Sequence, residues 1–221
     1  MHDALRRLLR DPFGTAARAW HKLVIAPRRY AVGDDYDAAR YWEERFLRHG
    51  PSLASVGDEG MSEAEIRAAY ASQAGEIFGM LERAGVGIAG SRLLEIGCGN
   101  GYYAELLRAR GLAQYQGLDI TDAFFPLLRE KFPGFRYVHG DITADRIEGE
   151  FDVVLVRKLG APGNPEFAIG AIDETGWAYL GPYAAMAGAN AAYIERAKAR
   201  ELETIRKRRA QYSPLHPPID P

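Results

Sequence analysis

Hydrophobic positions in the first part of the 221-residue chain follow a helical period. One amphipathic helix is expected over residues 35–46 and stops before Pro51. A second begins at Ser62, whose spacing to Glu65 is that of a capping box, and ends at Gly85. Its apolar positions form one stripe: Ile66, Tyr70, Ile77, Leu81 and Ala84. This stripe predicts that the second helix packs on a sheet.

Short apolar runs then alternate with helical patterns. Four runs are typical of strands: residues 93–96, 115–118, 136–140 and 151–156. The helix after the first run ends at Gly111, and the helix after the second run has Phe124, Leu127 and Leu128 on its buried face. Strands joined by helices of this length form right-handed crossovers in a parallel sheet, and ligands bind at the carboxyl ends of such strands. The pattern therefore predicts an α/β fold.

A glycine turn joins the first strand to its helix. Gly97, Gly99 and Gly101 occupy every second position, which permits positive φ angles and lets a ligand approach the backbone beside the free N–H groups of a helix start. The dinucleotide fingerprint G-x-G-x-x-G would require glycine at position 102, where this chain has Tyr102. The turn thus favours a nucleotide-sized ligand other than a nicotinamide dinucleotide.

Carboxylates stand at the ends of the first three predicted strands. Glu95 lies in the first run, Asp119 ends the second run 22 residues after Gly97, and Asp141 follows the third run. A carboxylate at the end of the second strand can accept two hydrogen bonds from a ribose diol. The spacing indicates one site shared by three neighbouring strands.

The segment from Glu95 to Gly101, E-x-G-x-G-x-G, followed in order by Asp119 and Asp141, resembles the motifs of class I S-adenosylmethionine-dependent methyltransferases. The resemblance implies a Rossmann-like sheet, of which the first four parallel strands are present, and S-adenosyl-L-methionine as the cofactor. It places the glycines around the methionine part, Asp119 at the ribose and Asp141 at the adenine. The implied cofactor-binding residues are Glu95, Gly97, Cys98, Gly99, Gly101, Asp119, Ile120, Asp141 and Ile142.

The same resemblance assigns residues 1–60 to an N-terminal helical cap that covers the cofactor and shapes the acceptor site. Tyr36, Tyr41 and Trp42 are then candidates for contact with a small-molecule or sugar-like acceptor. Aromatic residues at helical spacing also occur as ordinary packing, so both interpretations stay open. No residue of the sequence is identified as the catalytic base.

The chain departs from the methyltransferase pattern after Val156. The runs V-R-K-L-G-A-P and N-P-E-F-A-I-G-A-I, at residues 156–162 and 164–172, resemble one branch of the type I phosphoribosyltransferases. The sequence thus predicts a cofactor-binding domain at 61–156 and an atypical α/β fragment at 157–221, with a long charged helix over residues 190–212. Residues 167–172 and 177–180 are expected to add strands to the open edge of the parallel sheet.

Three functions follow from these two resemblances. The first is a methyltransferase. Its turnover would be impaired because the usual C-terminal strands are missing. The second is a phosphoribosyltransferase-family fusion protein, without activity because both loops that hold the diphosphate and its magnesium ion in that family are missing. The third is a non-catalytic protein that binds S-adenosylmethionine.

Composition and charge limit which binding partners and which cellular compartment are expected. A net charge of −2 argues against a general nucleic-acid-binding protein, and one cysteine, Cys98, fits a reducing cytoplasm. No run reaches the roughly 18 apolar residues of a transmembrane helix, and no His/Cys/Asp cluster has metal-ligand spacing. Residues 1–29 are basic and amphipathic, which fits a helical extension that is packed on the domain or partly disordered or, less well, a segment that lies on an anionic membrane surface. Nothing in the sequence indicates the oligomeric state.

Overall fold

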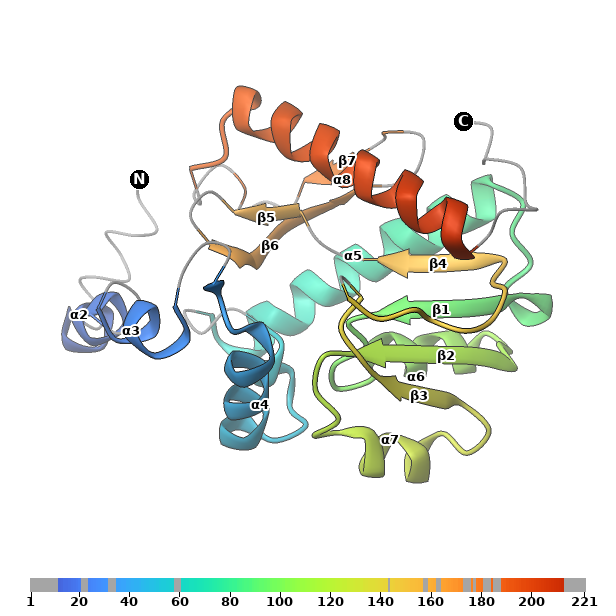
Figure 1. Cartoon of the computed structure of the whole chain (residues 1–221), viewed down its shortest axis with the longest axis horizontal. Coiled ribbons are helices and arrows are strands. Elements are labelled where there is room, and N and C mark those ends of the chain that lie inside the picture. Colours follow the sequence, from blue (N-terminus) through green and yellow to red (C-terminus); the bar gives the residue numbers. More distant parts are fainter. Residues whose placement is uncertain are drawn as a thin grey trace.

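The computed structural model describes residues 12–20, 24–31, 35–57, 61–142, 144–156, 159–161, 164–172, 176, 178–180, 184 and 188–212. Two sheets and the helices around them make up this part of the chain (Figure 1). The helices before the first strand are α2 (Pro12–Trp20), α3 (Ala26–Tyr30), α4 (Ala38–His49), the short 3-10 helix η3 (Leu53–Ser55), α5 (Glu63–Arg83) and the 3-10 helix η4 (Ile88–Gly90).

The larger sheet has four parallel strands. They are β1 (Arg92–Ile96), β2 (Gln114–Asp119), β3 (Arg136–His139) and β4 (Val153–Val156), in the spatial order β3-β2-β1-β4. Helix α6 (Tyr102–Ala109) joins β1 to β2, and α7 (Phe125–Lys131) joins β2 to β3. This arrangement confirms the predicted Rossmann-like α/β fold.

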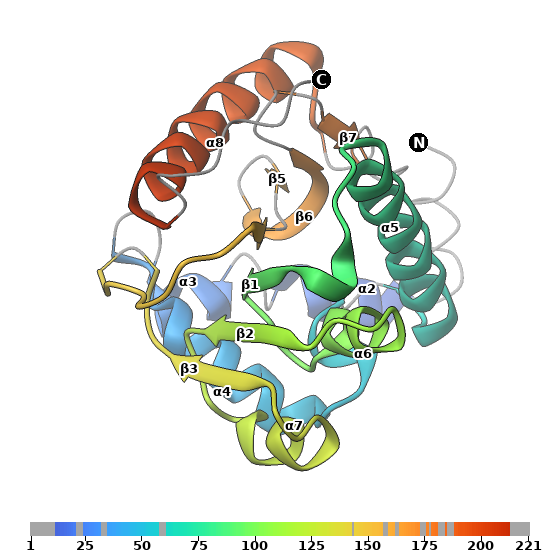
Figure 2. The same cartoon turned by 90° about the vertical axis from the view of Figure 1, so that its right-hand side faces the viewer.

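The two faces of the sheet are covered differently. Because side chains alternate along a strand, Leu93 and Tyr115 face the helices, where they join the core with Tyr103, Phe125 and Leu128. Figure 2 shows α5 and α6 together on this side. On the other face a smaller buried cluster consists of Leu94, Leu118, Ile147 and Phe151. The connection between β3 and β4 supplies the last two, so a loop covers this face among the described residues.

Local signals set the ends of the helices before the sheet. Both hydrogen bonds of the predicted capping box form at α5, between Ser62 and Glu65. Helix α4 begins three residues later than predicted because the Asp37 carboxylate caps it, accepting a hydrogen bond from Arg40 N at 3.0 Å. Both predicted helices therefore exist, with one start shifted.

The C-terminal segment forms a second sheet. Strands β5 (Leu159–Ala161), β6 (Asn164–Ile172) and β7 (Ala178–Leu180) pair antiparallel in the order β5-β6-β7. The predicted long helix is confirmed as α8 (Ala191–Tyr212), which packs on this sheet. A separate buried cluster of Ala184, Ala189 and Ala197 lies beneath it.

The expectation that residues 167–172 and 177–180 extend the parallel sheet is wrong; residue 177 itself lies outside the described residues. The strands pair with each other instead. Antiparallel strands need only a short connection, whereas a new strand parallel to β4 would need a crossover of a dozen or more residues. Only residues 162–163 separate β5 from β6, so β6 has an antiparallel partner next to it in the chain and pairs with β5 instead of β4.

Candidate functional site

The glycine turn after β1 has the backbone that its sequence predicts. Gly97, Gly99 and Gly101 have φ angles of 76°, 50° and 78°, in the region where glycine is favoured. Gly101 N donates to Cys98 O at 3.0 Å, which closes the turn just before α6. A Cβ atom on Gly97 would meet no other atom within 4 Å. The turn therefore leaves open space at its first glycine.

Asp119 ties this turn to the end of β2. Its Oδ2 accepts a hydrogen bond from Gly99 N at 2.8 Å, and its Oδ1 accepts one from Thr121 N at 3.3 Å. The side chain is only 7% exposed, and this burial raises the pKa of the carboxyl above its ordinary 3.8 although the bond from Gly99 opposes the shift. The structure thus places a partly desolvated carboxylate directly beside the glycine turn.

Glu95 lies beneath the turn on the helix-covered face of the sheet. Its side chain is fully buried, and Oε2 accepts a hydrogen bond from the Tyr115 hydroxyl at 2.7 Å. Burial and then the Glu95 charge raise the pKa of Tyr115 well above its ordinary value. A Cβ on Gly117, the residue opposite Glu95 on β2, would come within 2.9 Å of Cys98 Sγ. In this structure the side chains of Glu95 and Cys98 are buried against β2, between the glycine turn and the core.

The ends of β2 and β3 are joined by short contacts. Gly140 N donates to Asp119 O at 3.0 Å, and His139 Nε2 donates to the Ile120 carbonyl at 3.0 Å. Asp141 N donates to Asp145 Oδ2 at 2.7 Å. Ile142 packs with the apolar cluster on the other face of the sheet. The predicted residues of all three strands therefore gather at one edge of the sheet.

A segment of the N-terminal region, residues 38–57, covers this edge; we call it the cap segment. Figure 1 shows the arrowheads of the four parallel strands pointing toward the side where α4 stands. A Cβ on Gly99 would come within 3.0 Å of Val56 Cγ1 and 3.9 Å of Phe46 Cζ. Asn100 Nδ2 also donates to Ser52 O at 3.2 Å. The cap segment is thus packed directly on the glycine turn.

Aromatic rings run along α4 toward the turn. The candidate acceptor residues Tyr41 and Trp42 meet edge to face at 5.3 Å, and Tyr36 lies 6.1 Å from Tyr41. Trp42 contacts Phe46, which stacks on Phe124 at 4.5 Å. Phe46 and Phe124 were not predicted as site residues, although Phe46 follows Trp42 by four residues, the spacing of one helix face.

Arg45 was also missed, and it fixes the shape of the cap segment. The side chain is 7% exposed although it is charged. Nη1 donates to the Tyr41 hydroxyl at 2.8 Å, and Nη2 donates to Ala54 O at 3.2 Å and to Gly57 O. The guanidinium also lies over the Trp42 ring. These bonds hold the loop that carries Val56 against α4, and so against the turn.

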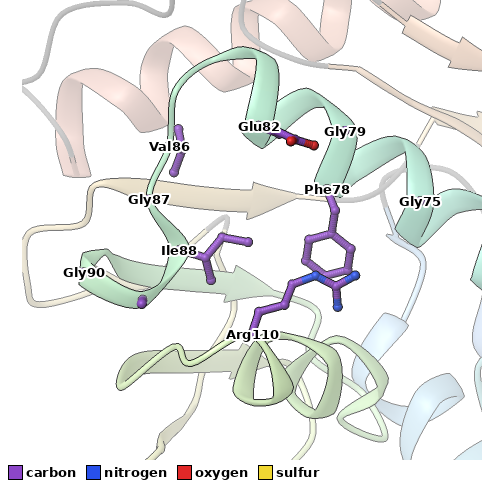
Figure 3. A pocket seen from close by; sticks show the side chains of 10 residues that line it. Gly75, Phe78, Gly79, Glu82, Val86, Gly87, Ile88, Gly90 and Arg110 are labelled. Carbon is purple, nitrogen blue, oxygen red and sulfur yellow. The ribbon is translucent and has the colours of Figure 1, made fainter.

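A hollow of about 660 Å³ lies at the opposite end of β1. Figure 3 shows Arg110 pointing at the Phe78 ring within it, and the guanidinium carbon is 3.5 Å from the ring centre. Residues 86–90, which precede β1, and α5 form its walls. No predicted site residue lines this hollow, so it is separate from the glycine turn.

Comparison with known proteins agrees with the motif. A protein-family model described as "Methyltransferase domain" matches residues 93–169. The match contains the glycine turn, Asp119 and Asp141, and it continues through β4 past Val156. The comparisons give no support to the predicted phosphoribosyltransferase fragment, which stays a prediction.

One solved structure is similar over part of the chain, the crystal structure of the protein TT1426 from Thermus thermophilus. The sequences are 30% identical, the similarity covers 62% of this chain and 50% of that one, and the TM-score is 0.30. The chain thus spans about half the length of that protein. No curated protein sequence matches the chain.

Proposed function

We propose that the chain is an S-adenosylmethionine-dependent methyltransferase that acts on a small-molecule or sugar-like acceptor. One observation carries the proposal: the Asp119 carboxylate at the end of β2 is hydrogen-bonded to Gly99, inside a turn of three glycines with positive φ after β1. The family match over residues 93–169 supports methyltransferase chemistry in general. The identity of the cofactor and the class of acceptor go beyond this match and are proposed here.

The residues at the turn fit a nucleoside cofactor. Open space beside Gly97 is what a backbone cradle requires, because a side chain there would occupy it. The glycine turn would hold the methionine part, and Asp119 would accept hydrogen bonds from the ribose hydroxyls. Asp141, Ile120 and Ile142 would meet the adenine side. Glu95 and Cys98 would act from beneath by shaping the turn.

The proposed reaction requires little chemical activation by the protein. S-adenosylmethionine, when bound, supplies a methyl group on an activated sulfonium. The chain would then orient the acceptor for an in-line displacement and exclude water, which are effects of proximity and alignment. The cap segment packs on the glycine turn, so we propose that Tyr41 and Trp42 on it, and Tyr36 two residues before it, contact the acceptor. We assign no catalytic base.

Isothermal titration with S-adenosylhomocysteine tests the cofactor assignment. We expect the wild-type chain to bind and the Asp119→Asn variant to bind at least about tenfold more weakly, because the amide offers one acceptor oxygen in place of two and carries no charge. Glu130→Gln is the matched control: it removes an exposed carboxylate on α7, and binding should be unchanged. Circular dichroism verifies the fold of each variant.

Two outcomes would contradict the proposal. One is a folded wild-type chain that does not bind S-adenosylhomocysteine, and the other is equal loss of binding in Glu130→Gln. A parallel titration with 5-phosphoribosyl-1-pyrophosphate and magnesium tests the phosphoribosyltransferase alternative, and we expect no binding. Cofactor binding without methyl transfer to any acceptor would favour the non-catalytic alternative.

A further inference from the structure

Among the described residues, the N-terminal helices carry large apolar side chains that are exposed. Phe13 on α2 is 88% exposed, Trp20 at the end of α2 is 61% exposed and Ile25 beside α3 is 39% exposed. Phe13 and Trp20 are seven residues apart, two helical turns, so they lie on the same face of α2. Figure 1 shows α2 and α3 at one edge of the molecule, away from both sheets.

Charge is concentrated in the same region. Residues 1–30 contain seven Lys or Arg and two Asp, a net charge of +5. The other 191 residues contain 21 Lys or Arg and 28 Asp or Glu, a net charge of −7. Arg28 is exposed on α3, and Arg29 beside it is paired with Glu44. Because the N-terminal segment is positive and the rest of the molecule is negative, the protein would approach an anionic surface with its N-terminal segment first.

We propose that this N-terminal surface, made of Phe13, Trp20, Ile25, Arg28 and Arg29, docks on an anionic lipid bilayer. Phe13 and Trp20 share one face of α2, and Ile25 precedes the basic residues of α3. Exposed apolar side chains on a helix face, near basic residues, can insert at the interface between headgroups and acyl chains. Basic residues near the surface add attraction to anionic lipids. No helix in the described part of the chain is long and apolar enough to cross a membrane, so this contact would be peripheral.

The part of this surface on α3 is bound to the cap segment. The Tyr30 hydroxyl on α3 donates to Glu44 Oε2 at 2.7 Å, Arg29 Nε lies 2.8 Å from the same oxygen, and Tyr30 packs edge to face on Tyr41 at 5.2 Å. Tyr30 is itself buried. Helix α3, which carries Arg28 and Arg29, is therefore attached to the domain, and docking through α3 would fix the orientation of the domain on the bilayer.

Sedimentation of the purified full chain with vesicles tests the proposal. We expect binding to vesicles of equal parts phosphatidylglycerol and phosphatidylcholine, and at least about tenfold weaker partitioning to phosphatidylcholine alone and at high salt. The double variant Phe13→Ser/Trp20→Ser should lose at least about tenfold in partitioning to the anionic vesicles. Leu127→Ser is the control and should bind as wild type does, because Leu127, which was wrongly expected on the buried face of α7, is 42% exposed.

Several results would overturn it. The wild-type chain could fail to bind anionic vesicles, it could bind both vesicle types equally, or the double variant could bind as well as wild type. A wild-type oligomer that the double variant converts to a monomer, without vesicle binding by either, would assign the surface to contact between copies. The comparison requires that the variants and the wild type have the same thermal unfolding temperature. We expect this result because Phe13 and Trp20 are both exposed.

Discussion

At the scale of single residues, comparing alanine at Gly97 with alanine at Gly85 distinguishes two effects. One is the loss of folding stability from a strained backbone, and the other is the loss of cofactor binding from a blocked site. Gly97 has φ 76° and Gly85, at the end of α5, has φ 68°, and a Cβ on either would meet no atom within 4 Å. Alanine at either position should lower the free energy of unfolding by about 1–2 kcal/mol, the cost of the left-handed conformation for a residue with a Cβ. The two substitutions thus strain the fold alike.

Only Gly97→Ala should affect the cofactor. Its new methyl group would occupy the open space where we propose that the methionine part lies, so we expect binding of S-adenosylhomocysteine to fall by at least about tenfold, while Gly85→Ala binds as wild type does. Urea unfolding and isothermal titration of both variants measure the two effects. Equal binding by the two variants would show that the cofactor does not approach Gly97.

At the scale of elements, Glu44 joins α3 to α4. It accepts hydrogen bonds from Tyr30 and Arg40 and pairs with Arg29. The bond from Tyr30, followed by those from the two arginines, lowers the pKa of the Glu44 carboxyl from 4.5 to about 2. Because the pKa is lower in the folded state, this group stabilises the fold above pH 4.5, and its contribution is lost as the pH falls from 4.5 toward 2.

Carbon-13 NMR titration of the glutamate carboxyls tests this junction. We expect Glu44 to titrate near 2 in the wild type and closer to 4.5 in Tyr30→Phe, which removes the largest cause of the shift. Tyr70→Phe is the control, because it removes a hydroxyl that donates to the Val56 carbonyl instead. An unchanged Glu44 titration in Tyr30→Phe would mean that α3 is not held to α4 by this bond.

The elements that the sequence predicted well are those with local causes. The capping box at Ser62 and the glycine turn at 97–101 are set by residues within a few positions of each other, and both have the predicted geometry. The prediction of a parallel sheet needed only the alternation of strands and helices, whereas the order of its strands came from the structure. By contrast, Phe46 and Val56 lie on Gly99 through contacts across more than 40 residues of sequence, which no local spacing encodes.

The pairing of β6 illustrates the same limit. Residues 167–172 were correctly predicted as a strand, to which the structure adds residues 164–166, but the sequence pattern does not determine with which strand β6 pairs. Likewise, the E-x-G pattern marked Glu95, at the end of the first strand run, as a cofactor-binding residue, whereas its full burial against Tyr115 depends on β2. The predicted cofactor set was therefore gathered at one edge, while its supporting contacts became visible only in the structure.

For the molecule as a whole, the buried clusters fall into groups that share no residue. The cluster of Ala184, Ala189 and Ala197 under α8 is separate from the clusters on the two faces of the parallel sheet. Among the described residues, its buried members are alanines and the larger apolar residues against it, Ile172, Tyr193 and Ile194, are only partly buried, so we expect it to contribute less stability than the core beside β1. We therefore expect the antiparallel sheet with α8 to open as a unit of its own.

Hydrogen exchange with mass spectrometry tests this division. Ala197→Glu places a charge in the small cluster, so we expect faster exchange in β6, β7 and α8 while β1 and β2 keep their protection and S-adenosylhomocysteine binding is unchanged. Ala199→Glu, at an exposed position of the same helix, is the matched control and should leave every segment as in wild type. If Ala197→Glu instead speeds exchange in β1 and β2 to the same degree, the two sheets unfold together. The boundary predicted near residue 157 would then divide the sequence but not the stability of the protein, and the cofactor site would depend on the C-terminal sheet.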